Sequence, residues 1–250
     1  MIYLDRGYIG CFEMRDKKTG KEQLEKYVTQ LKDAGHTRII APIDGDTWHK
    51  YRAVSWSNGE APFPLEPQNP LWYNEVFNEC GFKPLHKYSS YKFSLDNVTP
   101  LAKTDKAFNI RNFRESDLRI IYDISLQEFN ENFLYTDITF EEFSKLYEPL
   151  LPMLDEELTV IAEIDGNPVG FAFSFAISDT VILKTLAVRS EFRSSGIGAV
   201  LINHVLLVAS QKGIKHAVAA LMADGNNSLK IASKYEGEKI REYILYCLEV

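Results

Sequence analysis

One short segment carries the residue types best suited to chemistry. Residues 191–198 read EFRSSGIG, two residues after the apolar run VILKTLAV and directly before an apolar, helix-like stretch. A glycine disfavours a helix interior by roughly 1 kcal/mol, and a serine can cap a helix without any glycine. Gly196 and Gly198 at the start of a helix therefore indicate that a ligand comes close to the backbone.

A strand that runs through such a loop into a helix presents free backbone N–H groups at the positive end of the helix. These groups bind phosphate oxygens, and the Arg193 guanidinium adds a charge-assisted donor. No Gly-Lys-Ser/Thr follows, which excludes a Walker loop, and the third glycine of a dinucleotide-binding loop is missing. An ordinary strand-to-helix turn is the alternative, but the preceding TLAV and the later DGNNS favour a phosphate site.

These segments also carry a resemblance to a known family. LKTLAVRSEFRSSGIGAVLINHVL resembles motif A of the GNAT superfamily of N-acetyltransferases, and DGNNSLKIASKYEGEKIREYILY resembles the motif B that follows it. The resemblance covers about residues 108–250 and implies the GNAT acyl-CoA N-acyltransferase fold, of the α+β class with a mixed α/β sheet. It also implies acetyl-CoA (coenzyme A) as the cosubstrate and an amine of unidentified structure as the acceptor.

The resemblance assigns binding roles residue by residue. The diphosphate of acetyl-CoA falls to the N–H groups of the loop, namely those of Arg193, Ser194, Ser195, Gly196, Ile197, Gly198 and Ala199. The pantetheine arm pairs with a strand that splays from its neighbour, at Leu186, Ala187 and Val188. One N–H group of this strand polarises the thioester carbonyl. Asn226 or Asn227 takes the motif B position beside pantetheine, with plain turn formation as the alternative.

The acid–base residues are less clearly marked. Tyr235 lies nearest to the family's tyrosine that protonates the departing thiolate, with helix-end packing as an equal alternative. Many relatives carry a glutamate on the strand before the loop, where this sequence has Lys184 and Thr185. The candidate substitutes, each interpreted rather as a solvated carboxylate, are Glu128, Glu131 and Glu163. A water chain is a further route for the proton, so the general base is not assigned.

Turn and cap signals order the elements of the second half of the chain. DGN at residues 165–167 predicts a hairpin and a short SD turn follows, so three strands form an antiparallel meander. Thr139 and Glu142 form a capping-box pattern at a helix start, and Ser116 is the predicted N-cap of the preceding helix. Gly213 predicts the end of the helix that begins at the glycine loop.

The N-terminal half repeats the second half in part. The same spacing of 20 residues separates Arg15 from Gly35 and Arg193 from Gly213. The loop of this half, RDKKTGKE, has a single glycine and several charges, so we interpret it as a degenerate GNAT-like segment that does not hold CoA. The expected tandem organisation is a partial GNAT-like domain at residues 1–97, a polar linker at 98–107 and an acetyltransferase domain at 108–250.

Composition limits the class of partners. The chain has 250 residues and a formal net charge of −7, with one dense basic group at residues 15–21, which argues against nucleic-acid binding. Three cysteines without metal-ligand spacing predict reduced thiols in a cytoplasmic protein and no metal site. The first ten residues do not have the pattern of a signal peptide, and the most apolar helix is too short to span a membrane. We expect a cytoplasmic monomer or homodimer.

The sequence leaves more than one class of function open. The favoured one is an N-acetyltransferase that acts on a primary amine of a small molecule, by direct attack in a ternary complex without a metal. The second is a non-catalytic acyl-CoA-binding or protein-interaction module. The missing strand glutamate favours it, and so does KYEGEK around Tyr235, which departs from the family's common motif B pattern of an aromatic residue after the glycine. A nucleotide-binding protein that uses the same loop is the third. The loops around Trp48 and His49 line a substrate cleft or only pack, and packing is favoured.

Overall fold

The computed structural model describes residues 1–101, 107–225 and 229–250. The chain forms two compact units, and each unit draws on segments that lie far apart in the sequence. The first unit comprises residues 1–90, 221–230 and 239–250, and the second comprises 91–220 and 231–238. The strands β5 (Lys83–Ser94), β10 (His216–Ala223) and β11 (Glu238–Glu249) contribute residues to both units.

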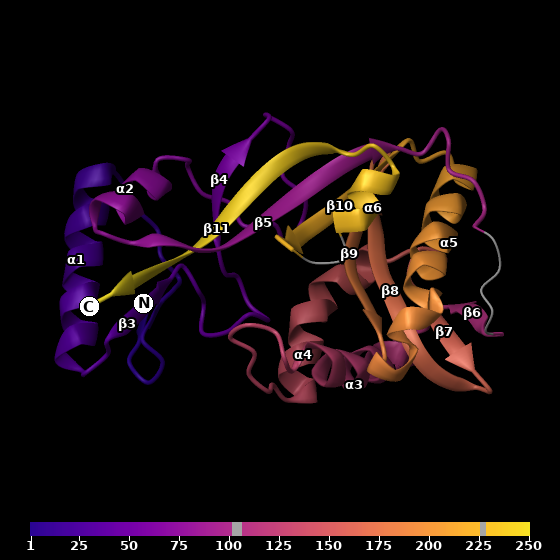
Figure 1. The fold of residues 1–250 in the computed structure, drawn as a ribbon, viewed down its shortest axis with the longest axis horizontal. Coiled ribbons are helices and arrows are strands. Elements are labelled where there is room, and N and C mark those ends of the chain that lie inside the picture. The colour runs from indigo at the N-terminus through magenta and orange to yellow at the C-terminus, as the bar shows by residue number, and fades with distance from the viewer. Residues whose placement is uncertain (102–106, 226–228) are drawn as a thin grey trace. The chain divides into compact units, whose positions relative to one another are not determined.

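The second unit contains a mixed sheet and its helices (Figure 1). Its strands lie in the order β6-β7-β8-β9-β10 and are antiparallel, except for the parallel pair β9–β10. The strands that precede β10 are β6 (Asn109–Asn112), β7 (Val160–Ile164), β8 (Asn167–Ile177) and β9 (Thr180–Val188). The helices are α3 (Leu118–Phe129), α4 (Phe140–Tyr147), α5 (Ile197–Gln211) and α6 (Leu229–Lys234), with the 3₁₀ turns η1 (Glu115–Asp117), η2 (Glu148–Met153) and η3 (Ser190–Ser195).

The meander of β7, β8 and β9 confirms the expectation from the turn signals. Asp165 and Gly166 have φ values of 50° and 76°, and both central residues of a type I′ hairpin turn require a positive φ. Ile164 pairs with Asn167 across this turn. The predicted end of α5 is also confirmed, because Gly213 has a φ of 82° and follows the last turn of this helix.

Of the two predicted helix caps, the one at the start of α4 is confirmed and the one at the start of α3 is wrong. Thr139 and Glu142 form the predicted capping box at the start of α4, because each side chain accepts the backbone N–H of the other. The prediction that Ser116 caps α3 is wrong. Ser116 lies inside the 3₁₀ turn η1, where the Asp117 carboxylate accepts the Arg114 N–H at 2.8 Å. The 3₁₀ turn leads directly into α3, whose N-cap residue is Asp117 and has no side-chain cap bond among the described residues.

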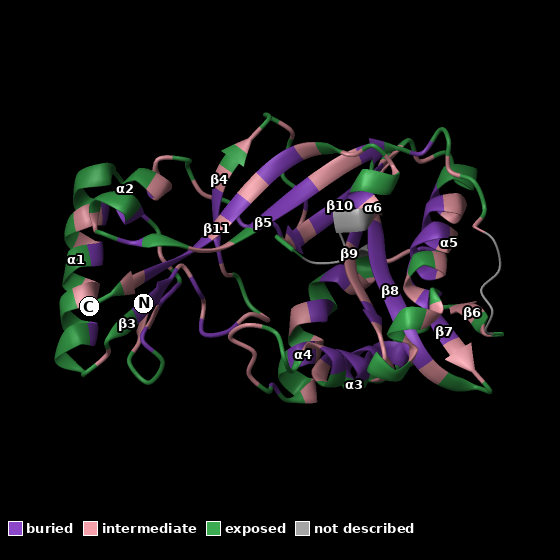
Figure 2. Cartoon of the chain, viewed as in Figure 1, coloured by how far each residue is buried: buried purple, intermediate pink, exposed green. Residues whose placement is uncertain are grey.

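The core of the second unit forms where β8 and its neighbours meet the helices (Figure 2). Its largest fully buried side chains are Phe143, Phe171, Phe173 and Phe175. A buried polar residue, Asn203 on α5, accepts the Leu101 N–H and donates to the Thr99 carbonyl, both at 2.9 Å. These two bonds attach Thr99 and Leu101, at the start of the expected linker, to α5.

The C-terminal strand completes the sheet of the first unit. The strand order there is β1-β2-β3-β11-β5, with β4 also paired to β11. Tyr246 of β11 lies opposite Ala41 of β3 in an antiparallel pair. The remaining elements are β1 (Ile2–Tyr3), β2 (Tyr8–Ile9), α1 (Lys17–Asp33), β3 (Arg38–Ala41), β4 (Ala53–Ser57) and α2 (Tyr73–Glu79). Their core includes Leu24, Leu31, Ile39, Phe77 and Tyr246.

The compact units interleave in the sequence, because β11 is the last strand of the chain and yet belongs to the first unit. The ranges 1–97, 98–107 and 108–250 follow the sequence resemblance, and as domain boundaries they stay a prediction. In the described part of the chain, no helix is long and apolar enough to cross a membrane. The same residues include no group of His, Cys, Asp and Glu side chains arranged to hold a metal ion.

Candidate functional site

The strand before the glycine loop parts from its neighbour, as the resemblance implied. β9 and β10 pair in parallel from Thr180↔His216 to Leu183↔Ala219, and no further pair between them follows among the described residues. On its other edge β9 stays paired with β8, where Leu186, Ala187 and Val188 lie opposite residues 170–172. The edge of β9 that faces away from β8 therefore has unpaired backbone groups over residues 186–188, and an extended ligand can add to it as a strand does.

A bulge marks the point where the two strands part. The register between β8 and β9 shifts there, so Phe173 lies opposite Thr185 and Ser174 lies opposite Leu183, with Lys184 as the extra residue. A bulge bends its strand, and here it bends β9 immediately after the last pair with β10. Sequence reasoning placed Lys184 on this strand but gave no signal for the bulge.

The glycine loop leads from β9 into the start of α5. η3 (Ser190–Ser195) is a 3₁₀ turn, and Gly196 then adopts φ 80°, a left-handed conformation that favours glycine. Within the described residues, no side chain caps the N-terminus of α5. The first N–H groups of this 15-residue helix are thus directed at whatever lies in front of it.

Gly198 has no comparable backbone reason. A Cβ atom at this position would lie 3.5 Å from the Leu186 side chain and 3.6 Å from the Val188 side chain, which is ordinary contact. The protein itself therefore does not require a glycine there. The same contacts show that the start of α5 lies against the part of β9 that is unpaired, so the loop and the strand edge form one site.

Arg193 of the loop is tied to the end of α3. Its Nη2 atom donates to Glu128 Oε2 at 2.9 Å and to the Glu128 carbonyl at 3.3 Å. The side chain of Arg193 is 57% exposed, so its other donors remain open to a ligand. Arg189 makes a second tie, because its Nη1 atom donates to Gln127 Oε1. Two successive residues of α3 thereby position the loop.

Glu128 corrects the expectation of a solvated carboxylate. Its side chain is only 3% exposed, and Oε1 is buried without a hydrogen-bond partner among the described residues. Ser125, one helical turn earlier, also has a buried Oγ without a partner there. Leu118, Ile121, Ser125 and Glu128 form one stripe on the buried face of α3. That spacing was the signal in the sequence that sequence reasoning missed.

The other candidate bases have different positions. Glu163 was also expected to be solvated, which is wrong, since it accepts Arg111 Nε at 2.7 Å and is mostly buried. Arg111 pairs with Asp117 as well, so Glu163 belongs to a structural network at the β6–β7 edge. These partners raise the pKa of Arg111, the Asp117 hydrogen bond most of all. Glu131 is exposed, as expected.

The motif B residues are placed only in part. Tyr235 follows α6 and stacks on Phe93 with ring centroids 5.0 Å apart, and its hydroxyl lies 3.3 Å from Asn203 Nδ2. These contacts are those of a packed side chain, and its role as the proton donor stays a prediction. Asn226 and Asn227 lie outside the described residues.

The first unit has a counterpart of this site in which both parts are closed. α1 begins with Asp16, whose carboxylate accepts the Thr19 N–H at 2.8 Å, and this bond lowers the pKa of Asp16. A carboxylate of the chain itself thus takes the place of an anionic ligand. Beyond the β2–β3 pair, Ile43 N–H donates to the Ile9 carbonyl, and a Cβ on Gly10 would lie 1.9 Å from Ile43 O. The two strand ends therefore pair with each other.

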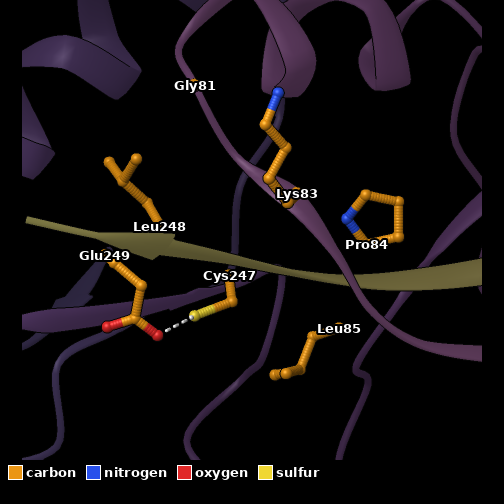
Figure 3. A pocket seen from close by; sticks show the side chains of 7 residues that line it. All are labelled: Gly81, Lys83, Pro84, Leu85, Cys247, Leu248 and Glu249. Carbon is orange, nitrogen blue, oxygen red and sulfur yellow. Dashed lines mark hydrogen bonds between the residues drawn. The ribbon is translucent and has the colours of Figure 1, made fainter.

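Two hollows of the first unit lie apart from the residues predicted for the site. One of about 330 Å³ is lined by Gly81, Lys83, Pro84, Leu85, Cys247, Leu248 and Glu249 (Figure 3). Burial raises the pKa of the Cys247 thiol, which donates to Glu249 Oε1 at 3.6 Å. The second hollow, of about 460 Å³, is lined in part by His49. The Nδ1 atom of His49 lies 2.8 Å from Asp46 Oδ1. Asp46 also accepts the N–H groups of Trp48 and His49, which is the pattern of a self-organised loop.

Comparisons with known proteins identify a family match and a shared fold. Residues 119–234 match the Acetyltransferase (GNAT) family. Among solved structures, a GCN5-related N-acetyltransferase from Sphaerobacter thermophilus has a TM-score of 0.65 at 14% identity, over 93% of this chain and 67% of that chain. A tandem GNAT protein from the clavulanic acid biosynthesis pathway has a TM-score of 0.54 at 11% identity, over 94% and 71%. A GCN5-related N-acetyltransferase from Kribbella flavida has a TM-score of 0.51 at 14% identity, over 93% and 76%. No curated protein matches the sequence.

Residues 119–234 match the GNAT acetyltransferase family, and the fold of the chain is that of solved GNAT structures, a tandem GNAT protein among them. This confirms the family resemblance and the fold class predicted from the sequence. The family match also supports acyl-CoA-dependent acyl transfer as the class of activity. Structural likeness at 11–14% identity extends to the fold alone.

Proposed function

We propose that the protein is an acetyl-CoA-dependent N-acetyltransferase that acetylates a primary amine of a small molecule. The observation that carries the proposal is the pairing of two features in one site. The edge of β9 at residues 186–188 is unpaired, and the uncapped start of α5 lies against it behind Gly196 and Gly198. An extended pantetheine arm fits the first feature, and a diphosphate fits the second.

The residues of the second unit have distinct tasks in this proposal. The N–H groups of residues 193–199 and the Arg193 guanidinium hold the diphosphate. The edge of β9 orders the pantetheine arm, and one of its N–H groups donates to the thioester oxygen as that oxygen gains negative charge. The acceptor nitrogen forms a bond to the carbonyl carbon, the C–S bond breaks, and the sulfur leaves as a thiolate. The amine loses one proton and the thiolate gains one, for which Tyr235 is the proposed donor.

The first unit does not supply a second cosubstrate site in this proposal. Asp16 satisfies the start of α1, and the Ile9–Ile43 bond closes the strand edge that would be needed. A diphosphate at α1 would also meet the Asp16 carboxylate, and like charges repel. The proposed stoichiometry is one acetyl-CoA per chain.

A binding experiment tests the proposal before the acceptor is known. We would titrate acetyl-CoA, ATP and NAD into the wild type and into Gly198→Glu, by calorimetry. We expect acetyl-CoA alone to bind, and Gly198→Glu to lose at least about 10-fold in affinity, because its carboxylate takes the anion position. Gly198→Gln is the matched control, since it adds a side chain of nearly the same size without the charge.

The same titration separates the other two interpretations. Binding of ATP or NAD in place of acetyl-CoA would identify a nucleotide-binding protein. Binding of acetyl-CoA without CoA release for any amine in a broad screen would favour the non-catalytic acyl-CoA-binding module. Absence of acetyl-CoA binding in a folded sample would contradict the proposed function.

A further inference from the structure

A positive charge lies where the two strands of the site part. Lys184 is the extra residue of the β9 bulge, between Leu183, which is the last residue paired with β10, and the unpaired edge that starts after it. In the proposed function, which this inference extends, the thioester lies beside that edge. A side chain at the bulge is therefore close to where the acceptor amine must enter.

The faces of the sheet show on which side Lys184 lies. Residues directly opposite each other share a face, and Thr185 lies opposite Phe173, whose ring contacts Tyr147 of α4 at 5.0 Å between centroids. Lys184 is on this same side, because its Nζ lies 5.3 Å from the centroid of the Tyr147 ring. Leu186 and Val188 point to the opposite face, where they meet Gly198 of α5. The ammonium thus lies on the α4 side of the sheet.

The charge of Lys184 is not compensated by a carboxylate of the chain. Across residues 1–101, 107–225 and 229–250, its Nζ has no carboxylate within ion-pair distance. Its contact is a cation–π interaction with the Tyr147 ring. Five other cations of the second unit do have acidic partners, namely Arg111, Arg119, Lys145, Arg193 and Lys212. Lys184 is also half-buried, so its unpaired charge is screened less than that of an exposed lysine.

We propose that Lys184 selects acceptors that carry a carboxylate next to the reacting amine, as an amino acid does. The ammonium binds the carboxylate as a charge-assisted pair, while the neighbouring nitrogen faces the thioester carbon. Polyamines and other purely cationic acceptors are disfavoured, because they bring a second positive charge to the same place. The site thereby gains specificity from a residue that takes the place of a carboxylate base.

The same charge has a consequence for the proton on the acceptor. A cation close to an amine disfavours the protonated form of that amine. In the acceptor proposed here, the neighbouring carboxylate stabilises the ammonium form of the amine, and its pairing with Lys184 weakens that stabilisation. The proton is therefore released before attack rather than to a strand carboxylate. This accounts for activity without a glutamate at the position of Lys184.

Two bisubstrate conjugates test the proposal without any need for turnover. In the first, the sulfur of CoA is linked through an acetyl group to the nitrogen of glycine, and in the second to the nitrogen of glycinamide. They differ only in the charge of the terminal group. We expect the wild type to bind the glycine conjugate at least about 10-fold more tightly, the size of a charge-assisted pair. Lys184→Met should reduce this difference to about 2-fold or less and retain affinity for CoA itself.

Two variants serve as controls. Lys184→Arg keeps the charge and should keep the preference, whereas Lys145→Gln removes an exposed positive charge from α4 and should not change it. Equal binding of both conjugates to the wild type, or a preference that persists in Lys184→Met, would overturn the proposal while CoA binding still supports the enzyme. If CoA and both conjugates fail to bind, the proposed function fails, and the role of Lys184 fails with it.

Discussion

Arg193 Nη2 donates to Glu128 Oε2 at 2.9 Å, so the first residue of the RSSGIG loop is held by a carboxylate that is almost fully buried. A buried carboxylate needs its partner, and this one has a single charged partner among the described residues. An exposed arginine loses rotamer freedom when it binds an anion, and an existing ion pair has already fixed part of that freedom. In the proposed function, we therefore expect Glu128 to position Arg193 for the diphosphate.

The first prediction concerns this ion pair. Glu128→Gln should raise the Kd for acetyl-CoA by about 5-fold, because a neutral acceptor holds Arg193 less firmly than a carboxylate does. A double-mutant cycle with Arg193→Met should show that the two losses are not additive, which a purely structural role of Glu128 would not produce. Glu131→Gln, an equal change of charge at an exposed position, is the control. Tighter binding by Glu128→Gln would show that repulsion of the diphosphate outweighs positioning.

The sequence was sufficient for the parts of this site that local pattern determines. The DGN and SD turns predict the meander. Gly196 and Gly198 predict the loop, and Gly213 predicts the end of α5. The bulge at Lys184 and the burial of Glu128 depend on partners from β8 and the loop, which no local pattern contains. A helical stripe that ends in Ser125 and Glu128 does identify them as buried, once the face of α3 is known.

The first unit shows the same limit more strongly. Local sequence pattern does not predict β4 (Ala53–Ser57) as a strand. It forms because residues Arg241 to Ile244 of β11 pair with it. β2 is short, with Tyr8 and Ile9 alone, since the next residues leave the extended region, with Cys11 at φ 45°. A partner from the far end of the chain therefore decides β4, whereas the local backbone at Cys11 ends β2.

The two glycines of the loop should respond differently to alanine. Gly196→Ala should cost about 1–2 kcal/mol of unfolding free energy, because alanine is strained at φ 80°. Gly198→Ala should leave stability unchanged or raise it by up to about 1 kcal/mol, since the backbone is helical and the space is free. Denaturant unfolding measures both. Gly213→Ala, at φ 82° but at the far end of α5, should lose stability with no loss of acetyl-CoA affinity.

The C-terminal strand should be essential to the first unit. Tyr246 stacks on Phe77 with centroids 4.9 Å apart, and its hydroxyl donates to Asn74 Oδ1 at 2.7 Å. Burial raises the pKa of Tyr246 to about 12, so the hydroxyl stays a donor at neutral pH. Tyr246→Ala should cost about 3–5 kcal/mol and Tyr246→Phe about 1 kcal/mol. Hydrogen exchange should locate the faster exchange of Tyr246→Phe in β3 and α2, and unchanged exchange there would contradict the assignment of β11 to this unit.

The closed counterpart in the first unit predicts the stoichiometry of binding. Calorimetry should give one acetyl-CoA per chain in the wild type, and Gly198→Glu should leave no second, weaker site. Asp16→Ala removes the carboxylate at the start of α1 but not the Ile9–Ile43 bond, so it should not create a site either. Two molecules bound per chain, or one still bound to Gly198→Glu with unchanged affinity, would place the cosubstrate in the first unit.

The stability of the protein should depend on pH through His204. Burial lowers the pKa of this half-buried histidine of α5 below its ordinary value of 6.5. Below pH 6.5 the unfolded chain therefore binds a proton that the folded chain does not, and this part of the stability, fully present above pH 6.5, is lost as pH falls through the folded pKa. His204→Gln should flatten the fall of the unfolding midpoint between pH 7.5 and 5.0, measured by urea titration at each pH. Parallel profiles for the wild type and His204→Gln would show that His204 is equally hydrated in both states.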